Sequence, residues 1–472
     1  MDVVAPIVIT LYATFQAVWC TLVALLIALP SAYFLWRYSF PGQQWCNALL
    51  YVFSVMPTKA AALAVDLCYQ VHGCMGISIG MLIINIPFAI LLMQQAYGCI
   101  DQLSLLVAAG LGASPWRCYR DIVWPQLYVA TKTAAGIIFV LCFCAVSFTP
   151  VLGTQWYHIT PDGMMQQAYQ VGNNMQVFLY GSIRLLLVFV VGYSTTHRKR
   201  SSLITHMPMH FTRKRYYIRE NPWWAIIVGV SMLSVSAPLV ALVRLGVSIG
   251  MIDYFYDLML AKPDAYIGFP AWHIFYQSMG IACMSGFGAV LVSIVLCWVR
   301  TRTHTRSTLV QLMVLLPFLI GGIGCGILFD CLTHLKILTP LGAMLISHII
   351  LNYPFAYQLL YAQSAAYDPE WTFCAQSLGA TLRSLYQTLY VPFMLPAVIN
   401  AWCLSMSLSI TEVGAASIVS RNSLMTLPMA LRMYRAASYD AGVLGIVCSM
   451  CILTCICALS SSYIQKRFMN FN

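Results

Sequence analysis

Two polar stretches of this chain match each other at a fixed distance along the sequence. Residues 98–127 read GCIDQLSLLVAAGLGASPWRCYRDIVWPQL, and residues 365–394 read AAYDPEWTFCAQSLGATLRSLYQTLYVPFM. We call them the paired loops. Three residue types recur 267 positions apart: Asp101 and Asp368, Gly112 and Gly379, Pro125 and Pro392. Because both stretches lie between long apolar runs, they predict two equivalent docking points for a partner of a membrane protein.

The composition supports a membrane setting. Hydrophobic residues make up 60% of the 472 residues and charged ones 8%, whereas an ordinary soluble domain carries about 25% charged residues. A water-soluble protein of this length could not cover its surface with so few charges. The sequence therefore predicts a polytopic membrane protein.

Continuous apolar runs predict how the chain crosses the membrane. A helix needs about 20 apolar residues to span a bilayer, and continuous runs favour helices over the alternating pattern of a β-barrel. We therefore expect an all-α protein with about eleven transmembrane helices. The candidate spans are 7–36, 46–66, 75–97, 128–152, 177–194, 223–245, 272–299, 308–330, 341–361, 394–419 and 440–464.

The match between the paired loops extends into their flanks. Residues 85–130 align without gaps with residues 352–397, and 13 of the 46 positions are identical. Chance would give roughly three or four identities for this composition. Six candidate spans separate the two loops, and an even number returns the chain to the same side of the membrane. The sequence thus predicts a tandem duplication with a parallel repeat, related by an axis along the membrane normal.

The duplication divides the chain into two halves. We place the first half at 1–196, a basic linker at 197–222 and the second half at 223–472. The first half then has five spans and the second has six, because nothing in the first half pairs with 223–245.

The basic residues predict the orientation. Residues 197–219 hold seven of the 25 Lys and Arg, and cytoplasmic loops are enriched in these residues. We expect the linker, the paired loops and the C-terminus in the cytoplasm and the N-terminus outside. This basic cluster fits a topology determinant that contacts lipid headgroups, so the net charge of +11 does not indicate a nucleic-acid partner.

No catalytic or metal-binding pattern stands out in the sequence. A phosphate-binding P-loop needs Gly-Lys-Ser/Thr, and none of the seven lysines follows a glycine. The cysteines show no metal-ligand spacing and fit small apolar residues within spans. We expect a chain that is not an enzyme, that has no cofactor of its own and that depends on an external energy source.

The sequence of each paired loop predicts two short helices joined at a glycine. Small residues, such as Ala108 and Ala109, allow a partner surface to approach closely. Gly112 breaks the first helix because glycine tolerates positive φ. Pro125, just before the next span, fits the start of a new helix. One such loop could also be an ordinary interfacial connector, but two copies favour an element that transmits a movement to the spans.

The paired loops resemble the "EAA" motif of ABC-importer permeases of the type I fold. The Gly and Pro positions are kept in both copies, but Val107 and Cys374 replace the acidic first residue. The resemblance implies a bacterial inner-membrane permease, two cytoplasmic ATPase subunits that bind ATP, and a periplasmic or extracellular substrate-binding protein. It implies these docking residues: Ala108, Ala109, Gly112, Pro125, Ala375, Gln376, Gly379 and Pro392.

Two fused halves are typical of thiamine and ferric-iron permeases, and several stretches resemble the thiamine permeases in particular. They are Phe40-Pro41-Gly42, Trp124-Pro125, Ile138 to Phe143, Cys374 to Gly379, and Thr426-Leu427-Pro428 with Tyr434-Arg435. The resemblance implies import of thiamine or its phosphates. A ferric-iron or other small-solute permease is the alternative, and a gradient-driven secondary transporter is a third reading.

Two candidate sites are ionisable residues within spans, which are costly and suggest function. An acidic Glu412 in the substrate path would suit cationic thiamine, although it could instead be a buried carboxylate paired with an arginine or a backbone amide. Lys59 and Asp66 are about two helical turns apart, so we expect them to share a face and partly neutralise each other.

Overall fold

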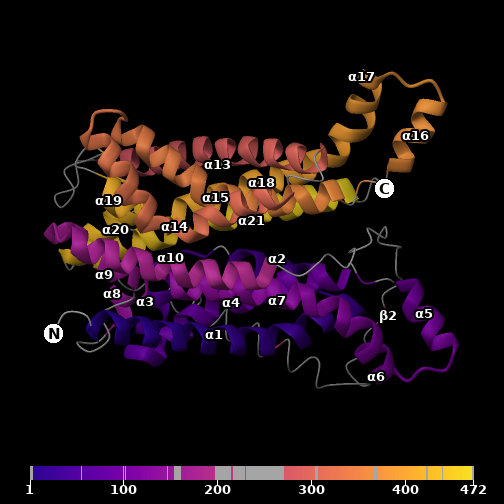
Figure 1. Cartoon of the computed structure of the whole chain (residues 1–472), viewed down its shortest axis with the longest axis horizontal. Coiled ribbons are helices and arrows are strands. Elements are labelled where there is room, and N and C mark those ends of the chain that lie inside the picture. The colour runs from indigo at the N-terminus through magenta and orange to yellow at the C-terminus, as the bar shows by residue number, and fades with distance from the viewer. Residues whose placement is uncertain are drawn as a thin grey trace.

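The computed structural model shows a bundle of long helices (Figure 1). It describes residues 4–54, 56–98, 100, 102–145, 147–153, 161–196, 214–215, 229, 270–302, 307–365, 367, 369–420, 424–437 and 440–469. The predicted span at 223–245, apart from residue 229, lies outside these residues, as do Asp101 and Asp368. The strand β1 (Tyr38–Ser39) pairs in parallel with β2 (Lys214–Arg215), and otherwise the described elements are helical.

The duplication extends through nearly all of the described helices without a gap. Eight helices of the first half each have a partner in the second half, and the first residues of the two helices in a pair are 266 or 267 positions apart. The pairs are α1 (Val4–Arg37) with α13 (Ala271–Arg302), α4 (Gly73–Gly98) with α15 (Pro340–Ala365), α5 (Gln102–Gly110) with α16 (Pro369–Ser377), α6 (Pro115–Cys118) with α17 (Leu382–Leu385), α7 (Trp124–Phe143) with α18 (Val391–Thr411), α8 (Thr149–Leu152) with α19 (Ala416–Val419), α9 (Pro161–Val171) with α20 (Leu427–Ala436), and α10 (Asn174–Thr196) with α21 (Asp440–Met469).

Two spans that correspond to each other in the repeat, one in each half, are broken at equivalent points. In the first half, α2 (Gln43–Ser54) and α3 (Thr58–Tyr69) meet at 97° around Pro57. In the second half, α14 (Ser307–His334) is interrupted at Gly321, whose φ of 66° and ψ of 175° are not helical. Gly321 lies 267 positions after Ser54, so the break is part of the repeat. Neither interruption was predicted from the continuous apolar runs.

Within the described residues, eight helices are long and apolar enough to cross a membrane, or nine if the bent α2–α3 pair forms one span. Together with that pair, they cover nine of the eleven predicted spans. The predicted span 440–464 lies within α21, whose apolar stretch Gly442–Cys457 is shorter. The protein is therefore multi-pass and helical, as the sequence predicts.

The two halves interlock through their last long helices. α10 of the first half packs against α14 of the second, and reciprocally α21 packs against α2. Val443, Leu444 and Val447 of α21 belong to the main hydrophobic core, together with residues of α1, α3 and α4. The short helices of the bundle lie at its two ends. Figure 1 places α5, α6, α16 and α17 at one end and α8, α9, α19 and α20 at the other.

Candidate functional site

The first helix of each loop ends in the same glycine-capped turn. Gly112 has a φ of 81°, and its N–H donates to the carbonyl of Ala109 at 3.0 Å while the N–H of Ala113 donates to Ala108 at 3.0 Å. These two hydrogen bonds satisfy carbonyl groups that would otherwise lack a donor at the end of a helix. The second loop repeats both bonds, with Gly379 (φ 84°), Gln376, Ala380 and Ala375 in the same roles.

After each glycine, the chain forms a helix that begins earlier than the proline at which the sequence predicts a new helix. Ser114 caps α6 by accepting from the N–H of Arg117 at 3.3 Å, and Thr381 does the same for α17. From there the helix runs on through a π-helical turn, Tyr119–Val123 or Tyr386–Tyr390, into α7 or α18.

Pro125 and Pro392 lie in the first turn of α7 and of α18, as the sequence predicts. Each of these helices, however, continues directly from a π-helical turn and does not start after a break in the chain. A proline lacks the N–H of a regular helix, and a wider π-helical turn is one way a helix absorbs such a local irregularity. The consequence is mechanical, because each loop is joined to its span without a flexible joint.

Both loops present apolar side chains to the surroundings. Leu111 is 84% exposed and its repeat partner Leu378 is 89% exposed. Leu106 and its partner Phe373 are exposed as well. Exposed apolar residues that cluster on a protruding element are typical of an interaction surface. The repeat therefore places two similar apolar tips at one end of the molecule (Figure 1).

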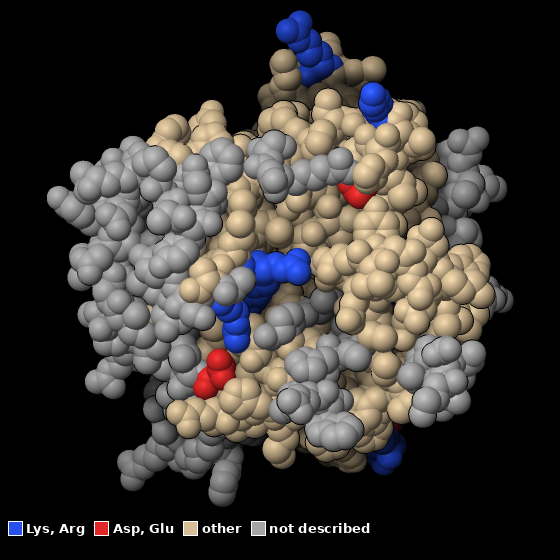
Figure 2. Space-filling view, turned by 90° about the vertical axis from the view of Figure 1, so that its left-hand side faces the viewer, with Lys and Arg blue, Asp and Glu red and all other residues tan. Residues whose placement is uncertain are grey.

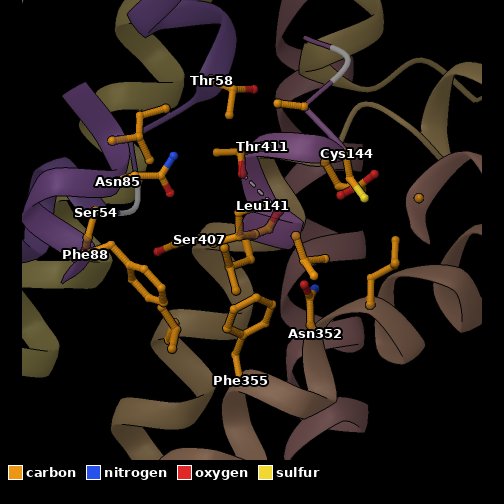
Figure 3. Close-up of a pocket in the computed structure, with 18 of the residues that line it drawn as sticks. Ser54, Thr58, Asn85, Phe88, Leu141, Cys144, Asn352, Phe355, Ser407 and Thr411 are labelled. Atoms are coloured by element: carbon orange, nitrogen blue, oxygen red, sulfur yellow. Dashed lines mark hydrogen bonds between the residues drawn. The ribbon is translucent and has the colours of Figure 1, made fainter. Parts of the chain in front are cut away.

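A cavity of about 420 Å³ lies between the two halves. Its wall contains repeat partners from both halves, which Figure 3 shows around the same space: Asn85 and Asn352, Phe88 and Phe355, Cys144 and Thr411. Leu141 and Ser407 also line it. The ends of α7 and α18 thus contribute to the cavity, and these are the helices that run continuously from the paired loops.

Glu412 lines this cavity at the end of α18. Its Oε1 accepts from the backbone N–H groups of Gly414 at 2.9 Å and Ala415 at 3.2 Å. The alternative that the sequence left open, a carboxylate paired with a backbone amide, therefore describes its local bonding. The residue both supports the turn before α19 and places a carboxylate at the cavity wall.

A buried ion pair that the sequence did not reveal lines the same cavity. Arg184 of α10 lies 2.7 Å from Asp162 of α9, and both side chains are almost fully buried. Arg184 also donates to the carbonyls of Phe318, Leu319 and Ile320 in the second half. These carbonyls directly precede the break in α14, so Arg184 satisfies acceptors that the broken helix leaves open. Arg184 thereby joins the two halves.

The predicted neutralisation of Lys59 by Asp66 is wrong for the described residues. Asp66 pairs instead with His72, at 2.8 Å, because α3 ends at Tyr69 and the following turn brings His72 back to it. Lys59 donates to the carbonyl of Pro428 at 3.2 Å. It thereby connects α3 to α20 of the other half.

Comparison with known proteins agrees with this architecture. The chain is 22% identical to the "Thiamine transport system permease protein ThiP" of Brucella abortus (strain 2308), over 93% of this chain and 85% of that protein. The protein of the same name from Escherichia coli (strain K12) is also 22% identical, over 96% and 88% of the two chains.

More limited similarity extends to another permease. A "Molybdate/tungstate transport system permease protein WtpB" of Thermococcus kodakarensis is 30% identical over 24% of this chain and 47% of that protein. No family model matches the sequence. Permeases of this kind are non-catalytic membrane subunits, and their ATP is bound by a partner ATPase. Its tandem helical halves and its near full-length similarity to the ThiP proteins show that this chain is a distant homologue of the ThiP permeases with the tandem-halved fold of an ABC permease.

Proposed function

We propose that this chain forms the membrane path of an ATP-driven importer for thiamine or its phosphates. The observation that carries this proposal is the placement of two equivalent apolar loops at one end of a bundle whose central cavity is lined by both halves. Similarity to ThiP proteins over more than nine-tenths of the chain supports thiamine as the substrate.

In this proposal the paired loops dock on two cytoplasmic ATPase subunits. Leu111 and Leu378 enter the partner surfaces, and the glycine-capped turns at Gly112 and Gly379 fix the direction of each loop. The other proposed docking residues are Ala108, Ala109, Pro125, Ala375, Gln376 and Pro392. Each loop moves together with the helix that continues from it, so closure of the ATPases swings α7 and α18 and changes access to the cavity.

The loop end then faces the cytoplasm, with the C-terminus, and the N-terminus lies outside. The division into halves at 1–196 and 223–472, joined by a basic linker at 197–222, and the EAA-like role of both loops are parts of the same proposal. A periplasmic or extracellular binding protein would deliver substrate to the end formed by α8, α9, α19 and α20.

The test is uptake by the permease reconstituted with its ATPase and binding protein in proteoliposomes. We expect thiamine uptake to require ATP and to continue when proton and sodium gradients are collapsed. Uptake of ferric iron or molybdate without thiamine would identify a different importer of the same class. Uptake that persists without ATP and stops with the gradient would instead establish a secondary transporter.

We propose that Glu412 attracts the positively charged ring of thiamine inside the cavity. Among the residues that line it, the other carboxylate, Asp162, is already paired with Arg184, so Glu412 leaves the wall with a net negative charge. Phe88 and Phe355 add aromatic faces, which attract cations. The arrangement fits an aromatic cation better than a small metal ion, whose ligands would be several converging carboxylates or imidazoles.

Glu412→Gln tests this role because glutamine keeps an oxygen that can accept from Gly414 and Ala415. We expect thiamine uptake to fall about tenfold, which corresponds to about 1.4 kcal/mol of lost attraction, while thermal stability changes little. Glu412→Ala also removes the acceptor and should lower both uptake and the melting temperature. Wild-type uptake by Glu412→Gln would leave Glu412 only its structural role at the turn.

A further inference from the structure

The end of the bundle opposite the paired loops carries a basic pocket. Figure 2 shows Lys and Arg side chains gathered at the centre of this face, in a hollow. A cavity of about 310 Å³ there is lined by Lys59 of α3 and by Arg432 and Arg435 of α20. Ligand pockets typically have volumes of roughly 300 Å³ or more. We call this cavity the basic pocket.

The three cations of the basic pocket are brought together by tertiary structure. Arg432 and Arg435 are three positions apart in α20 and so project from the same side of that helix, and both are exposed. Lys59 is half-buried and comes from the other half of the chain. Its ammonium lies close enough to be repelled by both guanidinium groups.

No carboxylate is among the residues that line the basic pocket. The acidic residue of α3, Asp66, is about 10 Å farther along the helix axis and is engaged by His72. In the described part of the chain, Lys59 has a neutral carbonyl, that of Pro428, as its hydrogen-bond partner. Like charges held together at a half-buried site repel one another, and an incoming anion would relieve that repulsion.

We propose that Lys59, Arg432 and Arg435 form a binding site for the phosphoryl group of a phosphorylated substrate at the outer mouth of the permease. Arginine recognises phosphate oxygens through paired N–H groups, and lysine adds a compact point charge. This inference rests on the proposed function for the identity of the substrate, but the phosphoryl site itself does not.

The position of the basic pocket fits a substrate with unlike charges at its two ends. Ser147, Val413 and Gly414 line both this pocket and the central cavity. Glu412, next in sequence to Val413, faces the cavity and not the basic pocket. When the three cations hold the phosphate of a thiamine phosphate, its cationic ring can therefore point into the central cavity, where Glu412 lies. Unphosphorylated thiamine gains nothing from the basic pocket and is repelled by it.

Binding of inorganic pyrophosphate to the purified full-length chain tests the site without any assumption about transport. We expect Arg432→Gln/Arg435→Gln to weaken binding at least tenfold in calorimetry, as expected for the loss of two charge-assisted contacts. Lys59→Met, which keeps the apolar stem, should weaken it similarly. The matched control is Arg117→Gln/Arg383→Gln, which removes two exposed arginines at the opposite end of the bundle and should leave binding within about twofold. Equal losses in both double variants, or none, would overturn the site.

Uptake by the reconstituted importer then assigns the source of the phosphoryl group. We expect Arg432→Gln/Arg435→Gln to reduce uptake of thiamine pyrophosphate at least tenfold, whereas uptake of thiamine should not fall. If the wild-type importer takes up neither compound, the proposed substrate is wrong while the pyrophosphate measurement still decides the site. Equal losses for both compounds, together with weaker docking of the binding protein and unchanged pyrophosphate binding, would mean that the cations meet acidic residues of that protein and that our proposal is wrong.

Discussion

Leu111→Asp combined with Leu378→Asp is expected to abolish ATP-driven uptake and to prevent the chain from co-purifying with its ATPase. Both leucines are more than four-fifths exposed, so the substitutions leave the folded chain intact. In the proposed complex each leucine is buried in the partner, and burial of one such side chain contributes roughly 1.5–3 kcal/mol. The loss at both sites amounts to a drop of at least about a hundredfold in affinity, before the cost of bringing a carboxylate into an apolar groove.

The duplication and the two ends of the bundle supply the controls. Each single variant retains one intact loop and should keep part of the ATPase affinity. Leu335→Asp/Ile337→Asp changes two exposed apolar residues in the turn between α14 and α15, away from the loops, and should not affect the ATPase. Normal co-purification and uptake by the Leu111→Asp/Leu378→Asp chain would show that the paired loops are simple connectors.

The second large effect is expected from Arg184→Met, which should strongly destabilise the chain and stop uptake. The substitution leaves Asp162 buried without its cation, and breaking a buried ion pair in this way costs about 3–5 kcal/mol. It also removes the donors for three carbonyls at the break in α14. The measurement is the melting temperature of the purified chain, together with uptake in proteoliposomes.

The double variant Asp162→Leu/Arg184→Met separates the two contributions of Arg184. Removing both charges avoids an unpaired buried carboxylate, so the melting temperature should recover in part. Uptake should not recover, because the carbonyls before Gly321 remain without their donors. Full recovery of uptake would show that Arg184 matters only as the partner of Asp162.

Gly321→Ala tests the same junction from the other half of the chain. A Cβ at this position would lie 1.8 Å from Nη2 of Arg184, and the backbone conformation of Gly321 is one that only glycine adopts readily, at a cost of about 1–3 kcal/mol for other residues. We expect lower stability and impaired uptake. Gly280→Ala is the matched control, because Gly280 is helical and has open space around its Cβ position. Equal behaviour of the two variants would contradict the proposed contact.

Local sequence signals predicted the paired loops well. Glycine is the residue that most readily adopts positive φ, so the sequence alone placed Gly112 and Gly379 at helix ends. The same reasoning was right only in part at Pro125 and Pro392, which lie in the first turn of α7 and α18 but in helices that continue from the preceding turn. Proline is compatible both with a helix start and with a position after a π-helical turn, and the residues around it do not decide between the two.

The charged residues of the cavity and its mouth show the limit of local reasoning. Arg184 is visible in the sequence as a cation within an apolar span, but its partner Asp162 lies in the short helix α9, which has no span-like pattern. Lys59 and Arg432 are separated by most of the chain and meet only because the two halves pack together. The high cost of an unpaired charge in lipid could have indicated that Arg184 has a partner. That cost does not identify which residue the partner is.

The sequence by itself determined that this is a multi-pass helical protein built from two tandem halves with an equivalent loop in each. Hydrophobic length, glycine conformation and internal similarity are properties of short segments, and they need no knowledge of distant contacts. Only the tertiary structure decided where the spans that contain Ser54 and Gly321 break, which residues share the cavity, and how Arg184, Glu412 and the basic pocket are placed between the halves. These features depend on contacts between segments far apart in the chain. Burial also strengthens the interactions between their charges, and sequence spacing alone does not reveal that burial.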